Sequence, residues 1–305
     1  MKVLTSPSSF GQVSSEPFDI LEENGFEVIN NPYGRKLTED EVIELAKDCI
    51  GIVAGVETLS AKVMDALPDL KCISRVGIGM DSVDLKYAGQ KGIIVNNTPN
   101  GPTRAVAELT LGMTMSLLRK IPQAHSDLKN RVWKKQIGNL LYNKVVGVIG
   151  LGRIGKLVSQ LFRGLENPVI GYDPFPDAGW AEKWDVKLVD FETLLKTADI
   201  ITIHVPGNED KSPVIGQKEL DLLKQGAFLI NISRGGIVDE SALYQALSEK
   251  KLAGAAIDVF SDEPYSGQLC DLDNVVLTPH LGSYAEEGKL LMEIDAVNNL
   301  INALK

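Results

Sequence analysis

Short runs of apolar, β-branched residues alternate with amphipathic segments along almost the whole chain. In the first hundred residues the apolar runs predict strands at 3–4, 26–29, 51–54, 71–75 and 93–95. The segments between them predict helices at 39–49, 60–67 and 83–89. Thr38 and Glu41 form a capping-box pattern at the start of the first of these helices. Such alternation is typical of a parallel sheet covered by helices.

A second series of the same kind begins at residue 145. Its expected strands are 145–149, 169–172, 186–189, 200–205, 227–232, 254–260 and 275–278. The segment 286–304 predicts a final helix with one buried face, formed by Leu290, Ile294, Val297 and Ile301. A turn-rich stretch at 96–102 separates the two series, and a helix predicted from Thr103 to Arg119 follows it, which Pro122 should end.

Composition limits the class of protein without indicating a function. The 305 residues are 44% hydrophobic and 24% charged, and 31 basic against 41 acidic residues give a net charge of −10. This mixture is typical of a soluble globular protein, and the negative charge argues against a nucleic-acid or anionic-membrane partner. The three cysteines, Cys49, Cys72 and Cys270, lie far apart without metal-ligand spacing. We therefore expect reduced thiols in a cytoplasmic protein, with no signal peptide, no membrane span and no metal.

The stretch from Val145 to Asp173 has the order that a dinucleotide-binding βαβ unit requires. An apolar strand pattern opens into the sequence Gly-Leu-Gly-Arg-Ile-Gly at 150–155, and a helical pattern and a second apolar run follow. Gly150 allows the tight turn, Gly152 lets the backbone approach a pyrophosphate, and Gly155 lets the helix pack on the strand. A glycine turn without a ligand is the alternative interpretation.

Asp173 closes the second apolar run of this unit. An acid at this place accepts hydrogen bonds from the ribose hydroxyls and repels a 2′-phosphate, so we expect NAD rather than NADP. The exposed N–H groups at the helix start suit the phosphates. Arg153 should contribute its backbone N–H there, while its side chain is solvated.

Ligands of an open parallel sheet collect at the carboxyl ends of its strands, and Arg234, Glu263 and His280 follow three of the predicted strands. Together they suit hydride transfer between NADH and a 2-keto acid. Histidine, with an ordinary pKa of ~6.5, is a proton donor near neutrality, and a carboxylate beside its far nitrogen fixes the tautomer. Arginine binds a carboxylate in a fixed fork. We assign His280 as acid/base, Glu263 as its orienting partner and Arg234 as substrate anchor.

Each of these residues also has a purely structural interpretation when it is taken alone. His280 would be a structural histidine, Glu263 an ordinary loop acid, and Arg234 a helix-capping or solvated side chain. His204 lies at another strand end, where we expect a structural or cofactor-lining role. His125 lies among polar residues and is expected at the surface.

Seven stretches, in order along the chain, resemble those of the D-2-hydroxyacid dehydrogenase family. They are RVGIGMDSVD at 75–84, NTPNGPTRAVAELT at 97–110, VIGLGRIG at 148–155, GYDP at 171–174, NISRGGIVDE at 231–240, GAAIDVFSDEP at 254–264 and TPHLG at 278–282. Within the family they are most similar to members that convert 3-phosphoglycerate to 3-phosphohydroxypyruvate, the first step of serine biosynthesis.

The resemblance implies two α/β domains with parallel sheets, Rossmann-like or flavodoxin-like, with a cleft between them. Residues 1–98 and 285–305 would form the substrate-binding domain, and 99–284 the NAD-binding Rossmann domain. A homodimer would be held largely by 103–142. Implied cofactor contacts are Ile78, Arg153, Ile154, Asp173, Val205, Ile232, Arg234, Asp258, His280 and Gly282. Implied substrate contacts are the backbone N–H groups of Val76 and Gly77 and the side chains of Arg75, Lys135, Arg234 and His280.

Two positions depart from the phosphoglycerate-specific pattern. Ala54 stands where those members often carry an arginine that contacts the phosphate, and Glu57 adds a nearby negative charge. Reduction of glyoxylate or hydroxypyruvate, which needs no phosphate site, is the nearest alternative. An NAD-sensing binding protein like the corepressors related to this family is a more remote one, against which the intact Arg234, Glu263 and His280 argue.

Overall fold

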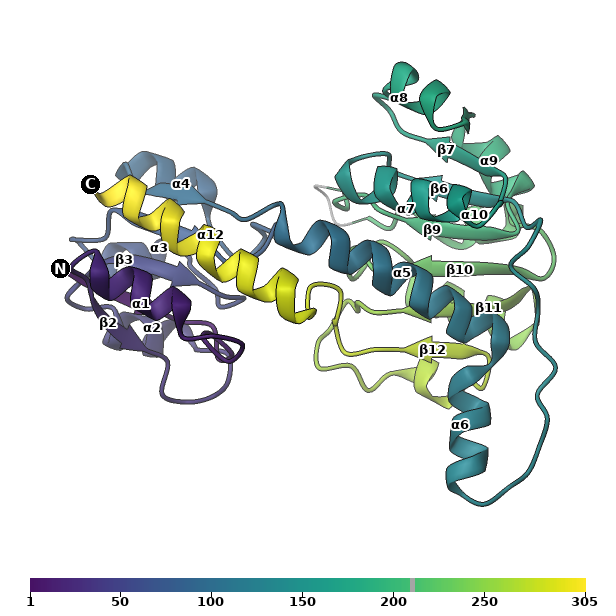
Figure 1. Ribbon diagram of the computed structural model, residues 1–305, viewed down its shortest axis with the longest axis horizontal. Helices are drawn as coiled ribbons and strands as arrows, with labels where there is room; N and C mark the ends of the chain where they lie inside the picture. Colours follow the sequence, from purple (N-terminus) through teal and green to yellow (C-terminus); the bar gives the residue numbers. More distant parts are fainter. Residues whose placement is uncertain (209–211) are drawn as a thin grey trace. The chain divides into compact units, whose positions relative to one another are not determined.

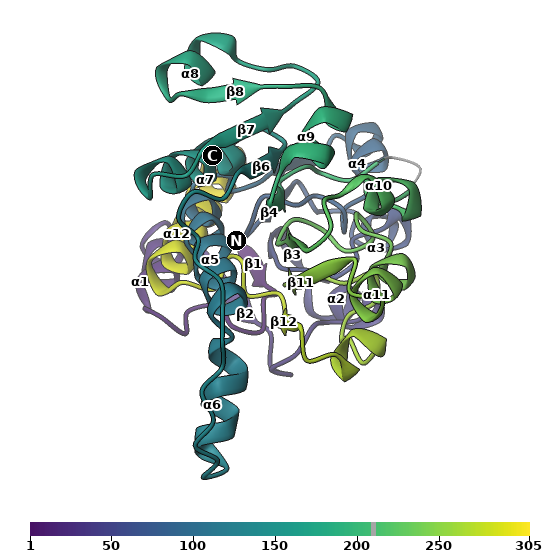
Figure 2. The same ribbon diagram turned by 90° about the vertical axis from the view of Figure 1, so that its right-hand side faces the viewer.

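The computed structural model describes residues 1–208 and 212–305, and the chain divides into two compact units (Figures 1 and 2). The first comprises 1–105 and 283–305, and the second comprises 106–282. Within the described residues, the first unit holds a five-stranded parallel sheet and the second a seven-stranded parallel sheet. The predicted α/β class with two parallel-sheet domains is therefore confirmed.

The sheet of the first unit has the strand order β2-β1-β3-β4-β5. Its strands are β1 (Lys2–Thr5), β2 (Glu27–Asn30), β3 (Cys49–Ala54), β4 (Cys72–Arg75) and β5 (Ile94–Asn96). This is the flavodoxin-like doubly wound order, in which the chain changes direction between β1 and β3. The carboxyl ends of those two strands are the expected place for a ligand of this unit.

Helices cover both faces of this first sheet. α1 (Glu16–Glu23) and α12 (Glu286–Leu304) pack on one face, while α2 (Glu39–Leu45), α3 (Ala61–Ala66) and α4 (Leu85–Lys91) pack on the other (Figure 1). Because alternate residues of each strand point to opposite faces, Ile52 joins one apolar cluster and Val53 the other.

The start of α2 confirms its predicted cap, but its end does not match the prediction. The N–H of Glu41 donates to Thr38 Oγ1 at 3.3 Å, and the N–H of Thr38 donates to Glu41 Oε2 at 2.8 Å. The helix ends at Leu45, and Cys49 begins β3 instead of ending the helix. The apolar run at 49–54 pairs with β1 and β4, and this sheet pairing overrides the helical periodicity.

The expected buried face of α12 was partly wrong. Val297 and Ile301 are buried, but Leu290 and Ile294 are only half-buried, and Met292, Ala296 and Leu300 take their place. A β-carbon at Gly101, in the first turn of α5, would lie 2.5 Å from Met292 Cγ. This close contact between α5 and α12 buries the face of α12 that carries Met292. Helical spacing alone does not reveal that contact.

The sheet of the second unit has the strand order β12-β11-β10-β9-β6-β7-β8. Its strands are β6 (Val146–Ile149), β7 (Val169–Tyr172), β8 (Val186–Leu188), β9 (Ile200–Ile203), β10 (Ala227–Asn231), β11 (Leu252–Ile257) and β12 (Val275–Leu277). The order is that of a dinucleotide-binding Rossmann sheet, with its change of direction between β6 and β9.

Two sets of helices enclose this second sheet. α5 (Gly101–Arg119), α7 (Arg153–Gly164) and α8 (Ala178–Lys183) share one apolar cluster with it, and α9 (Phe191–Thr197), α10 (Gln217–Leu222) and α11 (Glu240–Ser248) share the other. A short 3₁₀ helix, η1 (Gln268–Asp271), precedes β12. The described helices include none with the length and apolar character of a membrane span.

The long helix ends at Arg119, as the sequence predicted, and Pro122 lies beyond that end. It stands in the first turn of a separate helix, α6 (Ile121–Lys129), where a missing N–H costs nothing. α6 and the segment after it project from the second unit as an arm, residues 121–137 (Figure 2). The arm exposes large apolar side chains, namely Ile121, Leu128, Val132, Trp133 and Ile137.

Candidate active site

The glycine loop between β6 and α7 has the geometry of a phosphate cradle. Gly150 has φ +90°, and a β-carbon there would lie 2.5 Å from the carbonyl oxygen of His204. A β-carbon at Gly155 would lie 1.8 Å from the Gly150 carbonyl, so the helix packs directly on the turn. A β-carbon at Gly152 meets no described atom within 4 Å, which leaves the approach to the helix start open for a ligand.

Asp173 lies beside this loop at the carboxyl end of β7. Its Oδ2 accepts the N–H of Leu151 at 2.7 Å, and its Oδ1 accepts the N–H of Phe175 at 2.8 Å. The carboxylate is therefore fixed next to the glycine turn, as a ribose-binding acid must be. Arg153 begins α7 with an exposed side chain, as expected, and Ile154 follows it partly buried.

His204 and Val205 follow β9 and lie against the same turn. A β-carbon at Gly150 would come within 2.7 Å of a methyl group of Val205. The Nε2 atom of His204 lies 2.8 Å from the hydroxyl of Thr202, and burial lowers the pKa of His204 to about 3. The imidazole is consequently neutral at physiological pH and adds no charge beside the loop.

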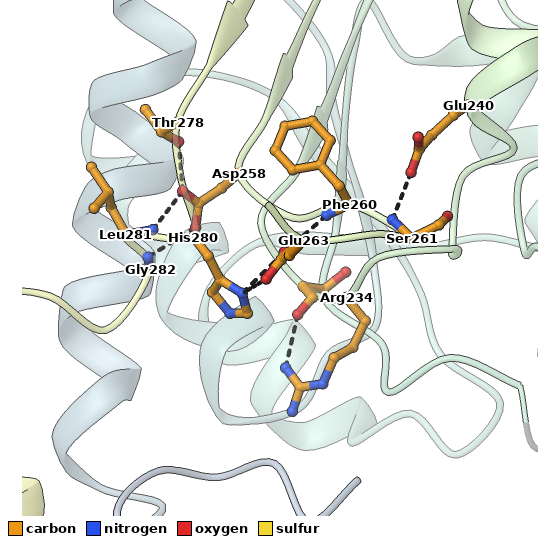
Figure 3. A network of polar contacts seen from close by, with 11 residues as sticks. Arg234, Glu240, Asp258, Phe260, Ser261, Glu263, Thr278, His280, Leu281 and Gly282 are labelled. Carbon is orange, nitrogen blue, oxygen red and sulfur yellow. Dashed lines mark hydrogen bonds and ion pairs between the residues drawn. The ribbon is translucent and has the colours of Figure 1, made fainter. Parts of the chain in front are cut away.

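His280 and Glu263 form the central pair of the site (Figure 3). His280 Nδ1 lies 2.9 Å from Glu263 Oε2 and 3.2 Å from Glu263 Oε1. The N–H of Phe260 also donates to Glu263 Oε1, at 3.1 Å. The His280 side chain is 49% exposed, so the ring is accessible although its Nδ1 is held. A carboxylate at Nδ1 leaves Nε2 as the nitrogen for proton exchange.

Asp258 fixes the backbone around His280. Its Oδ1 accepts the Thr278 hydroxyl at 2.5 Å and the N–H of Leu281 at 2.7 Å, and its Oδ2 accepts the N–H of Gly282 at 2.8 Å (Figure 3). Burial raises the pKa of Asp258, and these three donors act against that rise. His280 itself has φ +56°, which a non-glycine residue adopts only under such constraint.

Arg234 stands in the loop after β10 that the sequence singled out. Its Nη1 donates to the carbonyl of Ser233 at 2.8 Å, and its own carbonyl accepts from the Asn231 side chain at 3.0 Å. A β-carbon at the next residue, Gly235, would lie 1.8 Å from the carbonyl oxygen of Phe260. The loop of Arg234 is therefore packed directly on the loop that leads to Glu263. Ile232, the remaining expected contact here, is buried and lies near Gly282.

The expected substrate loop of the first unit follows β4. The N–H of Val76 donates to the Ala54 carbonyl at 2.8 Å, and the N–H of Gly77 donates to Thr98 Oγ1 at 2.7 Å. The Asn97 side chain donates to the carbonyl of Ile78 at 2.8 Å. Both N–H groups expected to bind a substrate carboxylate thus have protein acceptors in this structure. Arg75 Nη1 donates to the carbonyl of Val76.

The structure also identifies residues that sequence reasoning did not select. Thr98, Asn231, Glu240, Phe260 and Thr278 each hold a loop that carries a candidate residue. All five fall within the family-like stretches, but no pattern of residue types indicated which group each would meet. Lys135 is exposed in the arm of the second unit, whereas Arg75 lies in the first unit.

The fold and the glycine loop together define a dinucleotide-binding α/β unit, and a histidine–carboxylate pair lies at the carboxyl edge of its sheet. Residues 111–282 match the family described as "D-isomer specific 2-hydroxyacid dehydrogenase, NAD binding domain". The chain therefore belongs to the D-isomer specific 2-hydroxyacid dehydrogenase family, whose members depend on a nicotinamide dinucleotide.

Relatives and solved structures agree with this family. The chain is 39% identical over 310 residues to D-3-phosphoglycerate dehydrogenase of Archaeoglobus fulgidus, covering 100% of this chain and 58% of that protein. It is 42% identical over 258 residues to the enzyme of the same name from Methanocaldococcus jannaschii, covering 83% and 49%. The chain thus spans about half the length of the curated relatives it matches. The TT0316 protein from Thermus thermophilus superimposes with a TM-score of 0.90 at 31% identity, covering 100% of this chain and 97% of that one.

Proposed function

We propose that this protein catalyses the NAD-dependent interconversion of a D-2-hydroxy acid and its 2-keto acid. The observation that carries the proposal is the 2.9 Å contact between His280 Nδ1 and Glu263 Oε2, beside the loop of Arg234 and in the same unit as the glycine loop. In this proposal the first unit is the substrate-binding domain and the second is the NAD-binding domain.

Each of the three residues has one task. A bound nicotinamide supplies or accepts the hydride. In the reductive direction His280 donates a proton from Nε2 to the substrate oxygen, and in the oxidative direction it takes that proton back. Glu263 stabilises the charged ring and keeps Nδ1 protonated, so that Nε2 is the reacting nitrogen. The Arg234 guanidinium binds the substrate carboxylate and orients it.

NAD, rather than NADP, is the proposed cofactor. Support comes from Asp173, whose carboxylate is fixed beside the glycine turn and would repel a 2′-phosphate. A solved relative at 26% identity is an acyclic imino acid reductase in complex with NADPH, so the family fold alone does not decide between the two cofactors.

The names of the relatives support 3-phosphoglycerate as the substrate and a role in serine biosynthesis. A second candidate is hydroxypyruvate or glyoxylate, and the end of β3 favours it. Ala54 is fully buried there and supplies no positive charge. Glu57, 1% exposed, accepts the Gly55 N–H at 2.9 Å and the Ser6 hydroxyl. A buried carboxylate thus stands where an anion-binding residue would favour phosphate binding.

Steady-state kinetics with NADH on 3-phosphohydroxypyruvate, hydroxypyruvate and glyoxylate tests both the proposed reaction and the proposed substrate. A higher kcat/KM for the phosphorylated acid supports the phosphoglycerate assignment. Good turnover of hydroxypyruvate with none of phosphohydroxypyruvate would replace it with the second candidate. NADH binding without turnover of any 2-keto acid would overturn the dehydrogenase proposal itself.

We also propose that the protein is a cytoplasmic homodimer. The exposed apolar side chains of the arm, among them Trp133 and Ile137, form a surface suited to a second copy of the chain. Cys49 and Cys72 are buried free thiols, which fits a reducing compartment. Light scattering after size-exclusion chromatography gives the mass, and a monomer at micromolar concentration would contradict the dimer.

A further inference from the structure

We propose that Glu240 is a positioning residue that holds Glu263 against His280. The inference rests on the proposed function, in which the Glu263–His280 pair moves the proton. Glu240 contacts neither of those side chains in the described network. It acts through the two-residue segment Phe260–Ser261, in which the N–H of Phe260 binds Glu263 and the N–H of Ser261 binds Glu240 (Figure 3).

Glu240 binds the N–H of the peptide between Phe260 and Ser261. Its Oε1 accepts the N–H of Ser261 at 2.7 Å. Glu240 is the first residue of α11, and the cap residue Asp239 fixes that helix start by accepting the N–H of Ala242 at 2.9 Å. The carboxylate therefore extends from a rigid helix end to the loop, and an N–H to carboxylate bond is among the stronger hydrogen bonds in proteins.

The other side of the same peptide rests on Gly235. A β-carbon there would lie 1.8 Å from the Phe260 carbonyl oxygen and 2.8 Å from the Ser261 nitrogen, so the two backbones are in direct contact. The Phe260 ring stacks on Tyr265 with centroids 4.1 Å apart. Backbone contact on one side and Glu240 on the other thus hold the peptide in place.

Phe260 links this peptide to Glu263, because its own N–H, in the preceding peptide, faces the Glu263 carboxylate. The N–H of Phe260 donates to Glu263 Oε1, the same oxygen that lies 3.2 Å from His280 Nδ1. Two successive N–H groups of one loop thus donate to carboxylates, that of Phe260 to Glu263 and that of Ser261 to Glu240. If Ser261 is released, Phe260 can turn, and Glu263 loses the donor that keeps it facing the histidine.

The test compares three variants of the full chain. Glu240→Ala removes the acceptor, Glu240→Gln keeps an oxygen that can accept from Ser261, and Glu219→Ala is the matched control. Glu219 likewise stands in the first turn of a helix of the second unit, and its carboxylate accepts the N–H of Gly216 at 3.0 Å. Both alanine variants lose a first-turn acid and one backbone contact, so they should lose similar thermal stability.

We expect Glu240→Ala to lower kcat/KM for 2-keto acid reduction about tenfold. The alkaline limb of its pH profile should move about half a unit to lower pH, because a charged imidazole with a misplaced carboxylate is less stabilised. NADH affinity should stay within twofold. Glu240→Gln should restore both the rate and the pH profile, and Glu219→Ala should change neither.

NMR gives a readout that does not depend on turnover. The chain has three histidines, so the ring signals of His280 can be assigned by single substitutions. In Glu240→Ala these signals should change at a lower pH than in the unsubstituted protein. An unchanged NMR profile, or the same behaviour in the Gln and Ala variants, would overturn the positioning role. A protein that turns over no 2-keto acid, yet shows the NMR shift, would refute the proposed function and leave this inference standing.

Discussion

The backbone N–H of His280 donates to the carbonyl of Asp258 at 2.8 Å, while the Asp258 carboxylate binds the residues on both sides of that histidine. One buried acid thus determines the path of the chain through His280. The site depends on backbone hydrogen bonds as much as on the side chains that would meet a substrate.

Asp258→Asn should reduce both stability and turnover. The amide nitrogen that replaces Oδ2 faces the N–H of Gly282, so a hydrogen bond becomes a clash between two donors. We expect a loss of about 1–3 kcal/mol in the free energy of unfolding, measured with urea. Turnover at a temperature where the variant is fully folded should fall about tenfold or more, because proton transfer depends on the placement of His280. A stable variant with unchanged turnover would mean that other contacts hold this loop.

His280→Ala should abolish most of the turnover and leave cofactor binding almost intact. General acid–base catalysis contributes about 10²–10⁴ in rate, so kcat should fall by at least a hundredfold. NADH affinity, measured by fluorescence, should change less than threefold. His125→Ala is the control, since that histidine is exposed on α6. If His280→Ala keeps half of the original rate, another group must carry the proton.

Asp173→Ala should weaken NADH binding and reduce the preference for NADH over NADPH. The variant loses the proposed ribose acceptor and the negative charge that would repel a 2′-phosphate. It also frees the N–H of Leu151, a donor within the glycine loop. Dissociation constants for both cofactors provide the measurement. Asp177→Ala is the control, because Asp177 caps α8 and binds Lys156. An unchanged NADH/NADPH ratio would refute the ribose role.

His204 should make the folded protein sensitive to acid. Its pKa falls from 6.5 to about 3 on folding, so the unfolded chain binds more protons between those values. Stability is therefore complete above pH 6.5 and falls as the pH is lowered toward 3, by on the order of 1 kcal/mol for each pH unit. His204→Gln should lose less stability between pH 7.5 and pH 5 in urea titrations. The exposed His125→Gln should behave like the unsubstituted protein. Equal losses in all three proteins would show that other groups dominate.

Local sequence determined much of the fold because apolar periodicity and turn chemistry are local properties. The strands of both sheets lie within a few residues of their predicted places, and the Thr38–Glu41 cap forms as expected. Where the prediction failed, the cause was a contact distant in sequence. Cys49 joins β3 because that strand pairs with β1 and β4. α1 was not predicted, since its eight residues offer barely two turns of periodicity.

The candidate site, too, was predictable from the sequence only in part. Residue type and place at a strand end were enough to select Arg234, Glu263 and His280 as candidates, because the proposed hydride transfer would need such groups at that edge. Only the tertiary structure decided which nitrogen of His280 faces Glu263, that Asp258 binds both flanks of the histidine, and that Glu240 reaches Ser261. A hydrogen bond depends on tenths of an ångström and on direction, and these are set when separate loops pack together.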